Sequence, residues 1–297
     1  MAEARPAVEL GEPASYIPEL GKADKRQLGA CIFALDGNRY SVGDTRVRFS
    51  IQSISKVITL AAALERRGFA TVFDQVGMEP SGDAFNSLVR LEISESHPSN
   101  PMINSGAIAV SSYLAPVISF EEMLSFTRLL CMDADITLDE RVFRSEMSNI
   151  SRNRAIAYLL ENKGVIHSDV EQALEFYVKM CSLSVTAESL AGFGQLLANG
   201  GVEPATGKRL LGAETVRVVK TIMLTCGMYN ASGEFAVRVG LPSKSGVGGG
   251  ILSVADRRMG IGIFGPALDE KGNSVAGERV LETLSRQLKL HIFADRT

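Results

Sequence analysis

The stretch SISKVITLAAAL, residues 53–64, predicts the amphipathic helix around which the rest of the chain is organised. Its apolar residues recur at the spacing of one helix face: Ile54, Val57, Ile58, Ala61 and Leu64. Ser53 and Lys56 are three positions apart on another face, so their Cβ atoms are neighbours at about 5–6 Å. Gly68 predicts the end of this helix.

Strand-like patterns precede this helix and return in the last third of the chain. Residues 30–35 and 39–42 are β-prone runs around Asp36-Gly37, which is the pattern of a β-hairpin. The last third predicts three short strands and a closing helix, at residues 234–239, 250–255, 259–264 and 276–290.

The middle of the chain shows repeated helix signals and no strand pattern. Helix starts are indicated by Ser119-x-x-Glu122, Thr137-x-x-Glu140, Ser168-x-x-Glu171 and Thr186, and a further helix is expected at 213–225. The predicted fold is therefore of the α/β (α+β) class, with a mostly antiparallel sheet flanked by helices and an inserted all-α domain. We expect 1–68 and 230–297 to form the α/β domain and 69–229 the helical insert, with a ligand cleft at their junction.

Composition excludes several classes of protein. The chain has 31 Lys and Arg against 34 Asp and Glu, a net charge of −3, and no basic stripe, so a nucleic-acid partner is not expected. Residues 1–13 have no apolar core, which argues against a secretory signal and favours a cytoplasmic protein. Residues 97–120 lack Asp, Glu, Lys and Arg but contain five Ser and three Pro, which favours protein interior or a pocket wall over membrane.

The cysteines and histidines give no support to a metal site or a cofactor. The four cysteines are widely spaced among apolar residues and are expected to be buried, reduced thiols: Cys31, Cys131, Cys181 and Cys226. The three histidines have no metal-ligand spacing: His97, His167 and His291. We therefore expect a reaction without metal or organic cofactor.

Ser53 and Lys56 form a candidate nucleophile and base. A serine hydroxyl needs an adjacent base, and at a helix start it also lies beside unpaired N–H groups that favour an oxyanion. Burial or nearby cations would bring the pKa of Lys56 towards about 7–8, where it can accept a proton. The alternative is a Ser-x-x-Lys pair on a solvated helix face, a common chance occurrence.

A second motif favours the catalytic interpretation. Lys244-Ser245-Gly246 leads into a glycine-rich turn and an apolar strand, as does the Lys-Thr/Ser-Gly edge that lines serine-hydrolase sites with a Ser-x-x-Lys nucleophile. Ser151-Arg152-Asn153 matches the short third element of that set. The glycines at 246–250 lack the Gly-Lys-Ser/Thr ending of a phosphate loop, so close backbone approach to a substrate, or a strand bulge, is expected there.

Longer motifs identify a family. The chain resembles the serine-dependent glutaminases of bacteria in seven stretches, YIPEL (16–20), FSIQSISK (49–56), NPMINSGAI (100–108), RNRAIAY (152–158), LANGG (197–201), CGMY (226–229) and GLPSKSGV (240–247). The resemblance implies a β-lactamase/transpeptidase-like fold and hydrolysis of L-glutamine to L-glutamate and ammonia. It also implies a homo-oligomer, either a dimer or a tetramer.

The resemblance assigns the site residue by residue. It implies catalytic roles for Ser53, Lys56, Tyr229 and Tyr177. It implies substrate contacts for Tyr16, Gln52, Ser53, Asn104, Glu146, Asn153, Tyr177, Tyr229 and Val247. Glu146 would bind the substrate ammonium, and the N–H groups of Ser53 and Val247 would hold the oxyanion. Lys56, Tyr177 and Tyr229 all stand as candidates for the base in each step.

Two departures from the family pattern lie near these residues. Ser105 follows Asn104 where the family commonly has Ala, and Ile150-Ser151 precede Arg152 where Gly-Asp or similar is common. Two other functions share parts of the motif set. A β-lactamase or D-Ala-D-Ala peptidase would share the Ser-x-x-Lys and Lys-Ser-Gly motifs, and a ligand sensor could use the same fold without catalysis.

Overall fold

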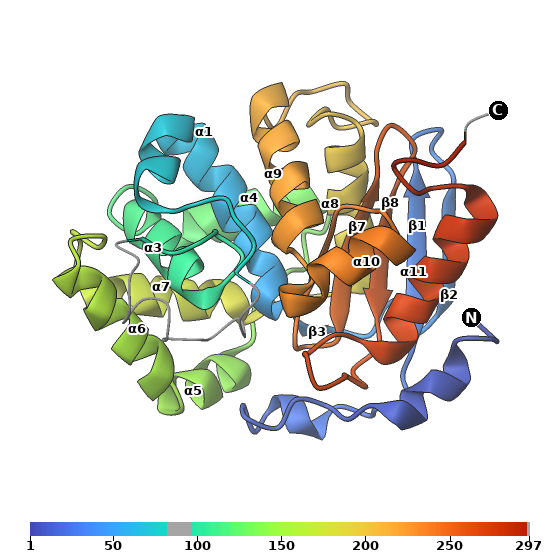
Figure 1. Cartoon of the computed structure of the whole chain (residues 1–297), viewed down its shortest axis with the longest axis horizontal. Helices are drawn as coiled ribbons and strands as arrows, with labels where there is room; N and C mark the ends of the chain where they lie inside the picture. Colours follow the sequence, from blue (N-terminus) through green and yellow to red (C-terminus); the bar gives the residue numbers. More distant parts are fainter. Residues whose placement is uncertain (82–96, 296–297) are drawn as a thin grey trace.

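The computed structural model describes residues 1–81 and 97–295. Its main sheet has five antiparallel strands in the order β2-β1-β8-β7-β6. The strand bounds are β1 Gly29–Ala34, β2 Arg39–Gly43, β6 Ser243–Ser245, β7 Gly250–Ala255 and β8 Met259–Phe264. The sheet thus joins the N-terminal hairpin to the last third of the chain, because β1 pairs with β8. Figure 1 shows this sheet on the right of the molecule.

The hairpin and the two apolar strands at 250–255 and 259–264 are confirmed. In the hairpin Ala30 pairs with Val42, and Gly37 in the turn has φ 90°, a conformation that glycine adopts without strain. Alternate residues of β1 face opposite sides, since Cys31 belongs to one core cluster and Ala30 to another. The sheet is therefore covered on both faces.

Helix α8 (Ala187–Ala198) covers one face of the sheet. Thr186 begins it with a capping box to Ser189, as predicted. Gly262 of β8 permits close contact, because a Cβ at this position would lie 1.9 Å from the Ala187 carbonyl oxygen. The opposite face is covered by α11 (Val275–Leu288) and the N-terminal 3-10 helix η1 (Arg5–Leu10), which share a core cluster with Ile251, Ile261 and Ile263.

Helices make up most of the remaining part, on the left in Figure 1. Their bounds are α1 Ser55–Gln75, α3 Asn104–Leu114, α4 Phe120–Cys131, α5 Glu140–Ser148, α6 Ser151–Asn162, α7 Val170–Cys181 and, beside the sheet, α9 Ala213–Cys226. The break expected at Gly68 is present, with φ 79° and ψ 164°, but helical structure resumes after it as far as Gln75. The uncharged stretch at 97–120 supplies α3, which is almost wholly buried, as expected.

The strand predicted at residues 234–239 is wrong. Residues Ser232–Arg238 form helix α10. A strand would place residues 235, 237 and 239 on one face, yet Phe235 and Val239 are buried while Val237 is 79% exposed. The four-residue spacing of the buried pair is that of a helix, and the sequence alternation over so short a stretch fits either structure.

Two of the predicted helix starts are wrong. Thr137 lies in strand β4 (Thr137–Leu138), and Asp139 caps α5 in its place. Asp169, not Ser168, caps α7. In each case an aspartate closer to the helix takes over, because its carboxylate accepts the N–H groups of the first turn.

A small second sheet runs through the region predicted as all-helical. Strand β5 (Leu183–Val185) pairs with β4 on one side and with β3 (Phe49–Ser50) on the other. β3 leads directly into the segment that carries Ser53. The division into 1–68 with 230–297, and 69–229, stays a prediction, and α8 packs on the main sheet from within the second range.

Two further expectations concern the whole chain. The four cysteines are free and buried, as predicted. Among the described residues, no helix is both long enough and apolar enough to cross a membrane.

Candidate active site

The predicted nucleophile lies where β3 turns into α1. The connecting 3-10 helix η3 spans Gln52–Ile54, and Ser53 within it is buried. Gln52 adopts φ 49°, a left-handed conformation that costs a residue with a Cβ about 1–2 kcal/mol. The Ser55 hydroxyl donates a hydrogen bond to the Gln52 carbonyl at 2.7 Å, which holds this turn. Ser53 is thereby fixed before the first turn of α1, beside unpaired backbone N–H groups.

Lys56 does not lie on a solvated helix face, because it is only 1% exposed. Its Nζ donates to Oδ1 of Asn104 at 2.6 Å, and Nδ2 of Asn104 donates to Oδ1 of Asn153 at 3.0 Å. Burial lowers the pKa of Lys56 to about 8. An amine with this pKa, one turn from Ser53, can exchange a proton with a serine hydroxyl near neutral pH.

Glu146 provides a buried negative group on the same side of the site. It lies in α5 and is 7% exposed. Nε2 of Gln52 bonds to Oε2 of Glu146 at 3.3 Å and to Oγ of Ser50 at 3.0 Å. Burial raises the pKa of Glu146 to about 7, while the Gln52 hydrogen bond and the charge of Lys56 act in the opposite direction. A buried carboxylate with so few partners can bind a cationic group of a ligand.

The opposite wall is formed by β6 and Tyr229. The Tyr229 hydroxyl donates to the Ser245 carbonyl at 3.2 Å, and the Nζ of Lys244 donates to the same oxygen at 2.6 Å. This Nζ also lies 4.1 Å from the centroid of the Tyr229 ring. Burial raises the pKa of Tyr229, and a side-chain hydrogen bond with Ser53 lowers it. Tyr229 therefore touches the candidate nucleophile directly.

Glycines allow the turn after β6 to pack against the segment between Ser50 and Ser55 that carries Ser53, called here the nucleophile turn. A Cβ on Gly248 would lie 2.1 Å from the Ser50 carbonyl oxygen, and one on Gly246 would lie 2.8 Å from that of Ile51. These distances exclude any side chain, so the two backbones can approach only with glycine at both positions. Val247, between the two glycines, is buried. The glycines thus permit close approach to the turn that carries Ser53, and the predicted approach to a substrate stays a prediction.

Tyr177 closes the site from α7. It is 5% exposed, and its ring centroid lies 5.9 Å from the Nζ of Lys56. Burial raises the pKa of Tyr177 well above its ordinary value. The phenol is therefore protonated at neutral pH and can donate a hydrogen bond.

Tyr16 lies at the mouth of the site on the N-terminal arm. The residue is 54% exposed overall, yet burial of its hydroxyl, followed by the charges of Tyr229 and Glu146, raises the pKa of Tyr16 well above its ordinary value. The hydroxyl end therefore points inward while the rest of the residue faces solvent. A cavity of about 520 Å³, lined by Tyr16 and Val247, opens between this arm and residues 268–272.

Comparison with known proteins identifies the family. The family model described as Glutaminase matches residues 11–293. This chain belongs to the glutaminase family. A glutaminase of Clostridium botulinum (strain Hall) is 52% identical over 290 residues, which cover 96% of this chain and 95% of that protein.

Solved glutaminase structures show the same fold. A probable glutaminase from Bacillus subtilis complexed with 6-diazo-5-oxo-L-norleucine has a TM-score of 0.90 and 39% identity, covering 98% of this chain and 94% of that chain. A covalent complex between a Bacillus subtilis glutaminase and 5-oxo-L-norleucine, formed by reaction with 6-diazo-5-oxo-L-norleucine, has a TM-score of 0.89 and 39% identity, covering 98% and 97%. The β-lactamase-like fold and the family expected from the sequence motifs are confirmed.

The residues that the glutaminase motifs predict lie together in the structure. Asn153 is joined to this cluster by its hydrogen bond with Asn104, and Gln52 by its hydrogen bond with Glu146. Their individual roles remain predictions. Sequence reasoning gave no role to Lys244 beyond its motif, and it missed Ser50 and Cys181, which support the nucleophile turn. The available signals were the Lys-Ser-Gly motif for Lys244 and the stretch FSIQSISK (49–56) for Ser50, whereas Cys181 carries no local signal.

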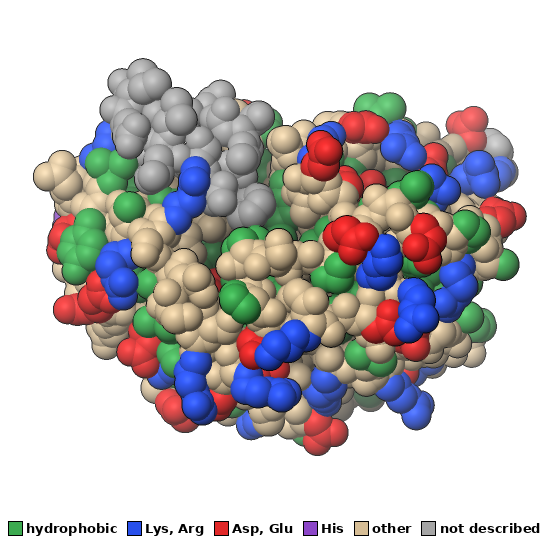
Figure 2. All heavy atoms as spheres, turned by 90° about the horizontal axis from the view of Figure 1, so that it is seen from below, with side chains coloured by type: hydrophobic (Ala, Val, Ile, Leu, Met, Phe, Trp, Pro, Cys, Tyr) green, Lys and Arg blue, Asp and Glu red, His purple; other side chains and the backbone are tan. Residues whose placement is uncertain are grey.

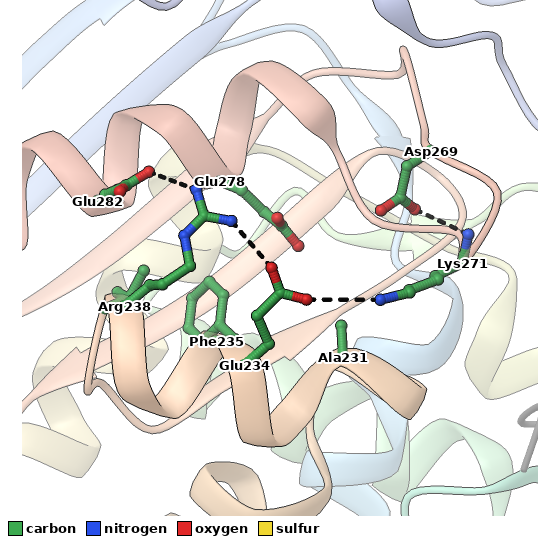
Figure 3. Close-up of a pocket in the computed structure, with 9 residues that line it drawn as sticks. Ala231, Glu234, Phe235, Arg238, Asp269, Lys271, Glu278 and Glu282 are labelled. Carbon is green, nitrogen blue, oxygen red and sulfur yellow. Dashed lines mark hydrogen bonds and ion pairs between the residues drawn. The ribbon is translucent and has the colours of Figure 1, made fainter. Parts of the chain in front are cut away.

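A separate charged cavity of about 170 Å³ lies between α10 and α11 (Figure 3). Glu234 lies between Arg238 and Lys271, at 3.2 Å and 3.6 Å, and Arg238 also bonds to Glu282 at 2.8 Å. Burial raises the pKa of Glu278, at the centre of this cluster, to about 7. None of the predicted glutaminase residues lines this cavity, and the Arg238–Glu282 ion pair joins α10 to α11.

Burial of Lys56 predicts how stability depends on pH. The pKa of Lys56 is about 8 in the folded protein against an ordinary value of 10.5, so between these pH values the unfolded chain binds more protons. The free energy of unfolding should rise over that interval by about 3 kcal/mol relative to a Lys56→Met variant. Denaturant unfolding at pH 7–10.5 measures the difference. The exposed Lys208→Met variant is the control, and curves for wild type and Lys56→Met that stay parallel would contradict the prediction.

Proposed function

We propose that this chain hydrolyses L-glutamine to L-glutamate and ammonia through a covalent intermediate on Ser53. The observation that supports it most is the buried Lys56 amine one turn from Ser53, with a pKa of about 8. The Bacillus subtilis relative that forms a covalent complex with 5-oxo-L-norleucine, in which a methyl group replaces the amide nitrogen of glutamine, supports the same kind of chemistry. No metal or organic cofactor takes part in the proposed reaction.

In the acylation step, Lys56 accepts the proton of the Ser53 hydroxyl as its oxygen attacks the side-chain amide carbon. The amide oxygen becomes an oxyanion, which the N–H groups of Ser53 and Val247 stabilise. The tetrahedral intermediate collapses, the C–N bond breaks, and the nitrogen leaves as ammonia after taking up the proton that Lys56 accepted, with Tyr229 as the proposed relay. A γ-glutamyl ester on Ser53 remains. Water then attacks the ester while Lys56 takes one of its protons, and that proton passes to Ser53 as L-glutamate is released.

Lys56 is the proposed base, and the tyrosines are proposed as donors. Burial lowers the pKa of Lys56 towards neutrality but raises the pKa values of Tyr177 and Tyr229. The lysine can therefore lose its proton near neutral pH, whereas the two phenols keep theirs. Because Tyr229 hydrogen-bonds with Ser53, it is the group placed to pass a proton to the leaving nitrogen.

Free glutamine presents an ammonium, a carboxylate and an amide. Glu146 is proposed to bind the ammonium, and Asn104, Asn153 and Tyr16 to contact the ammonium and the carboxylate, with Gln52 holding Glu146 in place. A buried polar site discriminates strongly, because a wrong ligand leaves its groups unpaired. A β-lactam or peptide substrate carries no such ammonium, so this set of residues favours glutamine over the two hydrolase alternatives.

Ammonia release from glutamine by the purified protein is the deciding experiment. Wild type should release it, and Ser53→Ala should be about 10³-fold slower, because the covalent route is lost. Ser111→Ala, which also removes a buried helical serine hydroxyl, is the matched control and should keep wild-type activity. Equal rates for wild type and Ser53→Ala would rule out the mechanism. Nitrocefin hydrolysis would favour a β-lactamase, and glutamine binding without turnover a sensor.

Glu146 should make substrate affinity depend on pH. Its pKa of about 7 means that the carboxylate loses its charge as the pH falls through 7, and with it the attraction for the substrate ammonium. KM for glutamine should therefore rise about tenfold between pH 8 and pH 6, in proportion to the loss of the charged form. Steady-state kinetics checks this. Glu146→Gln should have a high KM at both pH values, and Glu140→Gln, an exposed change on the same helix, should behave as wild type.

We also propose a cytoplasmic homo-oligomer, a dimer or a tetramer, with no nucleic-acid or membrane partner. Four buried, free thiols are typical of a reducing compartment. On the face shown in Figure 2, basic and acidic side chains are interspersed and form no basic stripe. Val237 and Phe293 are 79% and 84% exposed and line one apolar groove, which favours association. Light scattering should give two or four times 31.9 kDa, and a monomer at micromolar concentration would contradict the oligomer.

A further inference from the structure

Cys181 lies directly behind the nucleophile turn. It is the last residue of α7 and is 1% exposed. Its Sγ lies 3.7 Å from Oγ of Ser55, and its carbonyl accepts a hydrogen bond from Oγ of Ser50 at 2.8 Å. Ser50 and Ser55 flank the turn that carries Ser53. Cys181 therefore contacts this turn from both ends.

The direction of the hydrogen bond between Cys181 and Ser55 follows from the number of protons. A serine hydroxyl has one proton to donate. Ser55 gives its proton to the Gln52 carbonyl at 2.7 Å. The thiol must therefore donate to Oγ of Ser55, and the sulfur lone pairs are left free to accept.

The Cys181 thiol keeps its proton at neutral pH. Burial raises the pKa of Cys181 to about 12. The proton is therefore available for the hydrogen bond to Oγ of Ser55.

We propose that Cys181 is a positioning residue for the reaction: its thiol begins a hydrogen-bonded chain that runs through the Ser55 hydroxyl to the Gln52 carbonyl. The chain ends on the residue whose backbone is left-handed, directly before Ser53. The thiol therefore fixes the hydroxyl that holds the conformation presenting the nucleophile. This inference rests on the proposed glutaminase function, since its effect is on the rate of acylation.

A purely packing role is the alternative, and the chain offers a matched control for it. Cys131 is also 1% exposed and is also the last residue of its helix, α4, but among the described residues no hydrogen bond joins its thiol to the site. Changing either cysteine to alanine removes one sulfur atom from the core. Only the Cys181 change also breaks the hydrogen-bonded chain.

A double-mutant cycle on the full-length protein tests the proposal. Cys181→Ala and Ser55→Ala should each lower kcat for glutamine about fivefold to tenfold, the range that corresponds to one lost hydrogen bond, with KM within twofold of wild type. The double variant should be no slower than the slower single variant, because both changes break the same chain. Cys131→Ala should stay within twofold of wild type, and its effect should multiply with that of Ser55→Ala.

Three results would overturn the proposal. The first is Cys181→Ala with a kcat within twofold of wild type, and the second is a double variant whose loss is the product of the two single losses. The third is Cys131→Ala slowed as much as Cys181→Ala, which would show that core volume matters and not the thiol. Wild-type protein that releases no ammonia from glutamine would contradict the proposed function as well, so the wild-type measurement separates the two failures.

Discussion

Removal of the Lys56 ammonium from water is the constraint on which the site depends. Lys56 is buried within α1, and its amine donates a hydrogen bond to the neutral amide of Asn104, where a carboxylate would be the usual partner of a buried ammonium. A carboxylate in contact would stabilise the ammonium form and raise the pKa of Lys56, so the amine would stay protonated at neutral pH. The charge of Glu146 acts to raise the pKa of Lys56, but its carboxylate is hydrogen-bonded to the Gln52 amide and burial has the larger effect. The fold thus keeps Lys56 both buried and available to take a proton.

This arrangement has to be maintained by parts of the chain that are distant in sequence. The turn after β3 supplies Ser53, α3 supplies Asn104, α5 supplies Glu146, and η4 (Tyr229–Ala231) supplies Tyr229. Two of the contacts depend on backbones that approach without side chains, as at Gly248. Strain at Gln52 and at Tyr229, which has φ 54°, is tolerated because the surrounding packing fixes both residues.

Features that depend on residues close together in the sequence could be predicted, whereas features that depend on contacts between distant segments could not. The helix at 53–64 and the strands at 250–255 and 259–264 have clear periodicity, so local pattern was enough. The strand prediction at 234–239 was wrong because packing against α11, and not the alternation of residue types, decides that Phe235 and Val239 are buried. Motif resemblance named the site residues, but not Cys181, whose contact with Ser55 exists only after α7 folds against α1.

The pairing of β1 with β8 has a consequence for synthesis of the protein on the ribosome. The hairpin of β1 and β2 is made early, but its partner strand begins at Met259, more than two hundred residues later. Until then the inner edge of β1 has no neighbour, and such an edge invites pairing with other nascent chains. The turn that carries Val247 also emerges late, so a truncated chain holds Ser53 and Lys56 without their opposite wall. The site therefore cannot assemble until the turn after β6 has left the ribosome.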